Sequence, residues 1–142
     1  MLQELANNLD VADKVYFTGR VSPGSVANYY ALADVTVDPV YDTEAAKGRC
    51  PLKMFESWLA GTPFVTGDVG DRRALAGTPP AALLVTPGDV CDLAEKLKQT
   101  LTDKDLKIQL SELGKQRGSK FLWEKIISKK KDIFYEIFEK LQ

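Results

Sequence analysis

The sequence predicts an α/β fold in which a parallel sheet is flanked by helices. Short β-branched and aromatic runs alternate along the chain with segments whose apolar residues recur at helical spacing. Strands separated by helices pair in parallel, because the helix carries the chain back across the sheet. The 142 residues suffice for one buried core, and no internal repeat divides them. We therefore expect a single domain over residues 1–142.

The first three predicted elements are a helix, a strand and a second helix. Residues 2–11 place three leucines on one helical face, and residues 14–19 (KVYFTG) form a β-branched and aromatic run that ends at glycine. Residues 22–33 begin with Ser-Pro, a helix N-cap followed by proline at the first helical position. These signals predict that the strand over 14–19 belongs to the sheet.

The remaining elements follow from the same signals. Apolar or β-branched runs that end at Gly or Pro predict strands. Segments whose apolar residues recur at helical spacing, and whose ends are marked by Pro, Asp or Gly, predict helices. Strands are expected over residues 34–40, 63–67 and 81–89, and helices over residues 51–60, 70–77, 90–101, 103–121 (as a pair) and about 120–142. Ligands of such sheets bind at the carboxyl ends of the strands, near helix N-termini.

Composition and charge exclude several classes of protein. Nineteen basic and twenty acidic residues give a net charge of −1, too balanced for strong overall binding to nucleic acid. With two cysteines and no histidine, a zinc site, a disulfide framework and a histidine base are not expected. No apolar run approaches the ~20 residues of a membrane helix, and the N-terminus lacks signal-peptide character. A cytoplasmic protein without a metal or cofactor is expected.

The C-terminal part of the chain carries a local excess of basic residues. Residues 115–131 contain seven basic side chains: Lys115, Arg117, Lys120, Lys125, Lys129, Lys130 and Lys131. A solvated helix face explains most such runs. A peripheral contact with an acidic membrane surface or an acidic partner is the alternative.

The stretch GRCPLKMFESWLAGTPFV, residues 48–65, holds the candidate site. On the helix over 51–60, Leu52, Phe55 and Leu59 fall at core spacing, with Met54 and Trp58 beside them. Lys53 and Glu56 lie on the opposite stripe, together with Ser57 and Ala60. A helix that covers a sheet normally exposes such a stripe, so on spacing alone a solvated face explains this pair better than a ligand site does.

The loop before this helix favours a site for a nucleotide diphosphate. Gly48, Arg49 and Cys50 lead into free helical N–H groups, for which a phosphate is a natural partner. Arg49 and Lys53 add positive charge at the same end. Glu56, one turn further, can accept hydrogen bonds from both hydroxyls of a ribose. We take Cys50 as a small buried thiol rather than a nucleophile.

Five segments in order resemble one enzyme family along nearly the whole chain. They are VYFTGRV, YYALADVTVDPV, PLKMFESWLAGTPFVTGDVGDRRAL, LLVTPGD and FLWEKIISKKKDIF. The chain resembles the C-terminal, donor-binding domain of family-4-type glycosyltransferases of the GT-B fold, which has a Rossmann-like parallel sheet. The resemblance implies that Glu56 binds the ribose of a sugar nucleotide, that Gly48 to Leu52 contact the diphosphate, and that Gly19, Arg20 and Val21 lie against the base.

Two departures from the family pattern affect the expected activity. The family has a sugar-directed Glu at the position of Gly48, and Glu44 is acidic but four residues out of register. The family's Arg and Lys that neutralise the leaving diphosphate belong to an earlier unit, and its N-terminal acceptor-binding domain is also expected outside this chain. Because retaining transfer depends on that electrostatic stabilisation, the chain alone is expected to be inactive.

The closing helix is expected to cross back to the N-terminal domain, as the resemblance implies. Its apolar stripes include Ile126, Ile133, Ile137 and Leu141 on one side and Ile127, Phe134 and Phe138 on the adjacent side. A helix packed on one side only does not need so wide an apolar surface. We therefore expect self-association through this helix at high concentration.

A non-catalytic nucleotide-binding or regulatory α/β module is the alternative function. A receiver-like module needs an acidic cluster after its first strand, for which only Asp38 is available, and a lysine at the end of a late strand, which is absent. A degenerate partner subunit is compatible with Gly48. Among the other side chains, Tyr30 is expected in or beside the core, and Arg72 and Arg73 are expected to face solvent or pair with nearby acids.

Overall fold

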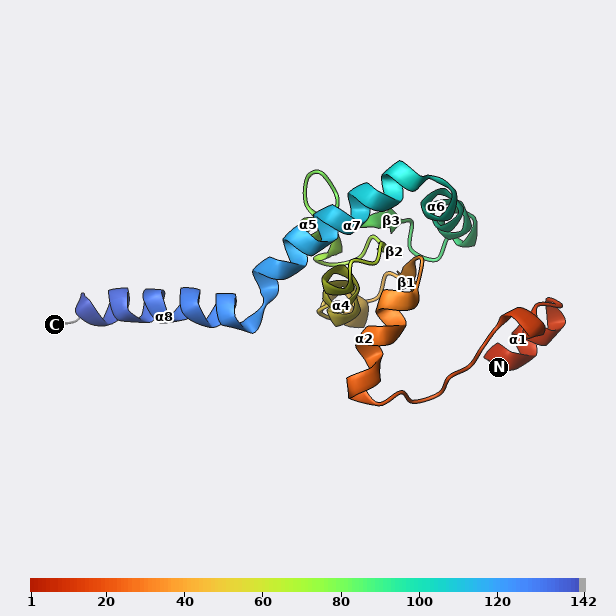
Figure 1. Ribbon diagram of the computed structural model, residues 1–142, viewed down its shortest axis with the longest axis horizontal. Helices are drawn as coiled ribbons and strands as arrows, with labels where there is room; N and C mark the ends of the chain where they lie inside the picture. Colours follow the sequence, from red (N-terminus) through yellow and green to blue (C-terminus); the bar gives the residue numbers. More distant parts are fainter. Residues whose placement is uncertain (141–142) are drawn as a thin grey trace.

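The computed structural model describes residues 1–140, in which a three-stranded parallel sheet is covered by helices (Figure 1). Leu141 and Gln142, which include part of the predicted closing stripe, lie outside the described residues. The helices are α1 (Leu2–Asn8), α2 (Pro23–Leu32), α3 (Glu44–Lys47), α4 (Leu52–Ala60), α5 (Arg72–Ala76), α6 (Val90–Thr102), α7 (Lys104–Gly118) and α8 (Trp123–Glu139), with 3-10 turns η1 (Ala12–Lys14) and η2 (Ser119–Phe121). The strands are β1 (Thr36–Asp38), β2 (Phe64–Gly67) and β3 (Leu83–Val85).

The sheet has the strand order β1-β2-β3, and both pairs are parallel. Thr36 is paired with Phe64, and Val65 with Leu83. All four residues of β2 are buried, as expected for a central strand covered on both faces. The carboxyl ends of the three strands therefore meet at one edge, beside the loop that precedes α4. This confirms the predicted α/β class and the parallel sheet.

The core lies between the sheet, α4 and α7. Trp58 is fully buried, and its indole Nε1 donates a hydrogen bond of 2.9 Å to the carbonyl oxygen of Ala81. Helix α7 approaches α4 closely because Gly114 has no side chain: a Cβ there would lie 2.5 Å from Cδ1 of Trp58. This packing fixes α4, and with it the candidate site, on the sheet.

The buried face of α4 differs from the predicted one. Met54, Ser57 and Trp58 are buried, whereas Leu52 is 66% and Leu59 47% exposed. Ser57 is buried because its hydroxyl donates to the carbonyl oxygen of Thr62 at 2.8 Å, which satisfies the polar group inside the protein. Leu52 and Leu59, which the sequence predicted in the core, line a surface hollow instead.

Other local predictions need correction. Residues 15–21 do not form the strand predicted over 14–19: they run as an extended connection away from the sheet, and Tyr16 is 86% exposed (Figure 1). Without a neighbouring strand to pair with, a β-branched run has no ladder to join. The segment predicted as a helix pair over 103–121 is one helix, α7, followed by η2, and the loop over 41–49 contains the short helix α3.

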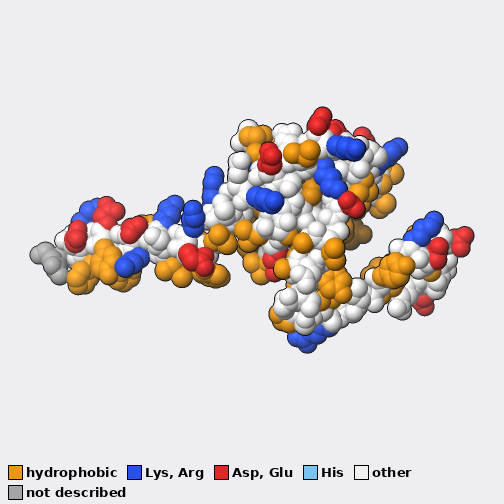
Figure 2. All heavy atoms as spheres, viewed as in Figure 1, with side chains coloured by type: hydrophobic (Ala, Val, Ile, Leu, Met, Phe, Trp, Pro, Cys, Tyr) orange, Lys and Arg blue, Asp and Glu red, His pale blue; other side chains and the backbone are white. Residues whose placement is uncertain are grey.

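Two terminal segments extend from the body of the molecule. Helix α1 packs against η1 apart from the sheet, and α8 projects at the opposite side (Figure 1). Figure 2 shows hydrophobic side chains along one side of α8, and Ile127, Phe134 and Phe138 are each more than half exposed. Across residues 1–140, no helix is long and apolar enough to span a bilayer.

Candidate functional site

A surface hollow of about 450 Å³ brings together most of the predicted diphosphate and ribose residues. Its wall includes Gly48, Arg49, Cys50, Leu52 and Glu56. The first three come from the loop between α3 and α4, and the last two from the first half of α4. The position of α4 on the sheet thus places the loop before α4 next to the carboxylate of Glu56.

Short-range contacts shape the loop between α3 and α4. The backbone N–H of Ala46 donates to Oγ1 of Thr43 at 3.2 Å, which caps α3, and α4 begins after Pro51. Gly48 has φ −77°, and a Cβ there would meet only the carbonyl oxygen of Glu44, at 3.7 Å. A side chain is therefore sterically possible at Gly48. Cys50 is exposed, not buried as expected from the sequence.

The opposite wall of the hollow is apolar. It is formed by Phe55 and Leu59 of α4 together with Phe121, Trp123 and Ile126 from η2 and the start of α8. The rings of Phe55 and Phe121 lie with their centroids 4.6 Å apart. The hollow thus has a polar side, formed by the loop before α4 and by Glu56, and a side that suits a flat or apolar group. The N–H groups of Leu52 and Met54 are not free, as the sequence led us to expect, because they donate to the carbonyl oxygens of Cys50 and Pro51 at 3.0 and 2.9 Å.

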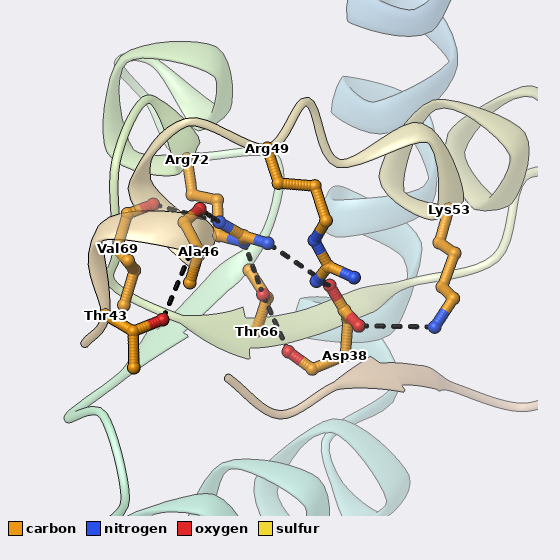
Figure 3. A network of polar contacts seen from close by, with 8 residues as sticks. All are labelled: Asp38, Thr43, Ala46, Arg49, Lys53, Thr66, Val69 and Arg72. Carbon is orange, nitrogen blue, oxygen red and sulfur yellow. Dashed lines mark hydrogen bonds and ion pairs between the residues drawn. The ribbon is translucent and has the colours of Figure 1, made fainter. Parts of the chain in front are cut away.

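Three cations converge on Asp38 at the carboxyl end of β1 (Figure 3). Oδ2 of Asp38 accepts from Nη2 of Arg49 at 2.9 Å and from Nη2 of Arg72 at 3.3 Å, and Oδ1 accepts from Nζ of Lys53 at 3.4 Å. Asp38 itself is buried, whereas the side chains of Arg49 and Lys53 are about half exposed. One carboxylate therefore holds two cations that also face solvent beside the hollow.

Arg72 is the internal support of this cluster. Of the two expectations for Arg72, facing solvent or pairing with a nearby acid, the structure shows the second: Arg72 pairs with Asp38 and is 0% exposed. Its Nε donates to Oγ1 of Thr66 at 3.1 Å, and its Nη1 donates to the carbonyl oxygens of Val69 at 3.1 Å and Ala46 at 3.4 Å. Arg72 thereby links β2, α3 and β1, and fixes the orientation of Asp38.

The charges around Asp38 determine its protonation. Burial alone would raise the pKa of its carboxyl group, but the Lys53 and Arg49 cations and the hydrogen bond from Arg72 outweigh burial and lower the pKa below the ordinary value. Asp38 therefore stays ionised at neutral pH. With three cations around one carboxylate, the cluster keeps an excess of positive charge.

Glu56 contacts a tyrosine rather than a lysine. The hydroxyl of Tyr30 in α2 donates to Oε2 of Glu56 at 3.0 Å. No ion pair joins Lys53 and Glu56 in the described part of the chain, since Lys53 turns to Asp38. Tyr30, expected as a core or half-buried aromatic, is half-buried, and it is also a polar contact of the candidate site that the sequence pattern did not indicate.

The predicted base-contacting turn lies at another hollow, of about 580 Å³. Gly19 and Val21 line it together with Lys53 and Tyr30, and Arg20 is exposed beside them on the extended segment. The predicted residues thus fall into two groups, one at the loop before α4 and one at this turn. Glu44 belongs to neither, because its carboxylate pairs with Nζ of Lys47 at 3.0 Å and is largely exposed.

Residues 1–103 match the family described as "Glycosyl transferases group 1". The chain belongs to this family. The match confirms the predicted resemblance and does not fit the receiver-like alternative. It covers the sheet, α4 and both groups of predicted site residues.

Two relatives named as a glycosyltransferase and a synthase align with most of the chain. A D-inositol 3-phosphate glycosyltransferase of Corynebacterium urealyticum is 30% identical over 123 residues, which cover 87% of this chain and 28% of the relative. An alpha-monoglucosyldiacylglycerol synthase of Streptococcus pneumoniae is 31% identical over 140 residues, covering 89% of this chain and 30% of the relative. The chain thus spans less than a third of the length of these two relatives.

Solved structures support the predicted GT-B architecture. Sucrose-phosphate synthase from Thermosynechococcus elongatus superposes with a TM-score of 0.82 at 27% identity, over 97% of this chain and 34% of the other. Anabaena HepE, solved in complex with UDP and glucose, superposes with a TM-score of 0.78 at 18% identity, over 97% of this chain and 35% of the other. This chain therefore has the fold of one domain of a GT-B protein, including the long closing helix.

Proposed function

We propose that this chain is the donor-binding part of a retaining glycosyltransferase that moves a sugar from a nucleoside diphosphate sugar to an acceptor. The observation that carries the proposal is the hollow in which the loop Gly48 to Leu52 and Glu56 come together. The UDP and glucose in the HepE structure, a protein of the same fold, support it further.

In this proposal the diphosphate lies against the loop and the two outer cations. Arg49 and Lys53 are half exposed, so they can turn from Asp38 toward a phosphate without unfolding the loop. The three cations around Asp38 exceed its single negative charge, and a diphosphate supplies the missing negative charge. Asp71, which also lines the hollow, opposes this attraction and limits how far the phosphates reach toward α5.

The ribose is assigned to Glu56. Its carboxylate lies on α4, one turn beyond Lys53, so a nucleotide held by its diphosphate at the loop extends its ribose toward it. A carboxylate accepts two hydroxyl donors at once, which matches the 2′ and 3′ hydroxyls. The base is then directed toward the turn of Gly19, Arg20 and Val21. We propose that no metal takes part in donor binding.

We propose further that the chain alone does not transfer sugar. The relatives are more than three times as long, and the resemblance places the acceptor site and further phosphate-binding cations in their remaining length. Binding of the donor without those groups stabilises the ground state but not the departing diphosphate. Nucleotide binding, not turnover, is therefore the property to measure on this chain.

The test is calorimetric titration of the chain with UDP, GDP and ADP, each without and with EDTA. We expect one of them to bind, and Glu56→Gln to weaken that binding by about tenfold, because a charged acceptor for two hydroxyls becomes a neutral amide. Glu112→Gln, which changes an exposed glutamate on α7, is the matched control and should bind as the unmodified chain does.

The outcomes separate the proposal from its alternatives. If Glu56→Gln and Glu112→Gln bind the nucleotide equally well, Glu56 does not contact it. Absence of binding for all three nucleotides would count against a donor site in this chain. Binding that disappears in EDTA would contradict the metal-free assignment.

A further inference from the structure

We propose that Tyr30 is a positioning residue that holds Glu56 in the orientation needed to accept the ribose hydroxyls. The inference rests on the proposed donor site and adds to it a group from a different helix. Its basis is the hydrogen bond of 3.0 Å from the Tyr30 hydroxyl to Oε2 of Glu56 across the α2–α4 interface.

The donor in this bond has a fixed position. Tyr30 lies in the last turn of α2, and its carbonyl oxygen accepts from Oγ1 of Thr62 at 2.6 Å and from the N–H of Ala33 at 3.2 Å. Thr62 follows the C-terminus of α4 and is buried, so the end of α2 is tied to the same helix that carries Glu56. The hydroxyl of Tyr30 is thus held relative to α4 by the backbone.

Glu56 needs such a contact because it is exposed on its helix. A free glutamate side chain samples several rotamers, and ordering it on ligand binding costs conformational entropy. With Oε2 held by Tyr30, Oε1 and the second lone pair of Oε2 remain available for two hydroxyl donors. The tyrosine therefore lowers the entropic cost of binding a ribose without occupying the whole carboxylate.

The phenol keeps its proton under all ordinary conditions. Burial, followed by the hydrogen bond to Glu56 and the charges of Glu56 and Asp38, raises the pKa of Tyr30 to about 12. The hydroxyl therefore stays a donor, and Glu56 stays the acceptor. Tyr30 also lines the hollow that contains Gly19 and Val21, so it stands between the proposed ribose contact and the proposed base contact.

The experiment compares ribose with a sugar that lacks both hydroxyls. The unmodified chain, Tyr30→Phe, Glu56→Gln and the double variant are titrated with UDP, GDP and ADP and with their 2′,3′-dideoxy counterparts. We expect Tyr30→Phe to bind the ribonucleotide about fivefold more weakly and the dideoxynucleotide equally well. In the Glu56→Gln background, adding Tyr30→Phe should change nothing.

The controls separate positioning from folding and from the function itself. Tyr41→Phe removes the hydroxyl of an exposed tyrosine that makes no side-chain hydrogen bond in the described part of the chain, and should bind normally. If Glu56→Gln weakens binding and Tyr30→Phe does not, the donor site stands and the inference on Tyr30 is overturned. The same holds if Tyr30→Phe weakens ribose and dideoxyribose nucleotides equally, because that pattern reports a structural role. If the unmodified chain binds none of the nucleotides, the proposed function fails and the inference fails with it.

Discussion

The ion-pair cluster around Asp38 leads us to predict that the free energy of unfolding depends on this carboxylate and on pH. Asp38→Asn keeps the shape of the side chain but removes the negative charge that three cations share. Arg49 and Lys53 can turn to water, whereas Arg72 is fully buried and cannot. The cost of the substitution is therefore concentrated on Arg72.

The magnitude follows from what Arg72 retains. Leaving one member of a buried ion pair without its partner costs about 3–5 kcal/mol. Arg72 keeps Thr66 and the carbonyl oxygens of Val69 and Ala46 as acceptors, so we expect the lower end, about 3 kcal/mol. For an m-value of about 2 kcal/mol/M, the urea midpoint falls by about 1.5 M.

The pH dependence has a defined sign. The pKa of Asp38 is lower in the folded protein than its ordinary value, so the charged carboxylate stabilises the fold above that ordinary value, and this stability is lost as the pH falls through the folded pKa. The difference between the unmodified chain and Asp38→Asn should be full at neutral pH and shrink at about pH 2.5.

Urea unfolding followed by circular dichroism at both pH values measures this difference. Asp132→Asn, an exposed carboxylate on α8 without an ion pair among the described residues, is the control and should change neither midpoint. A loss below about 1 kcal/mol at neutral pH, or an equal loss at both pH values, would refute the assignment of Asp38 as the charged centre that supports Arg72.

Two further predictions concern packing. Gly114→Ala should lower the free energy of unfolding by about 2 kcal/mol, because the new Cβ meets the indole of Trp58. Gly24→Ala is the control and should not lower it, because the space around Gly24 is open. Thermal unfolding of both variants measures the difference. The exposed apolar side of α8 predicts that the chain self-associates as its concentration rises, and that replacing Phe134 and Phe138 together by serine reduces this; a monomer mass by light scattering over a wide dilution series would contradict it.

Elements with a strong local signal could be predicted from the sequence. Ser-Pro before α2 and Pro51 with Gly61 around α4 marked helix ends, and Gly61 indeed has φ +79° at the end of α4. The run over 14–19 had an equally strong local signal but does not form a strand, because a strand also needs a partner, and local pattern carries no information about one.

The candidate site was predictable only in part, and the reason is again distance along the chain. The loop and Glu56 are close in sequence, so their proximity follows from one helix start. Tyr30 is 26 residues from Glu56, and Arg72 is 34 from Asp38, so no spacing rule connects either pair. A buried charge also looks the same in sequence as an exposed one: of the two expectations for Arg72, a solvated side chain or a pairing with a nearby acid, the structure shows the pairing, with Arg72 buried.

The projecting helix α8 also separates the two tryptophans of the chain into different environments. Trp58 lies at 0% exposure in the body, and Trp123, the first residue of α8, at 73%. Helix α8 contacts the body mainly through η2, so its melting is governed largely by its own helix–coil equilibrium rather than by the cooperative loss of the sheet. We therefore expect the intrinsic fluorescence to be the sum of a cooperative signal from Trp58 and a gradual one from Trp123. A fluorescence transition that does not coincide with that of another probe would then reflect the position of α8 outside the body rather than a folding intermediate.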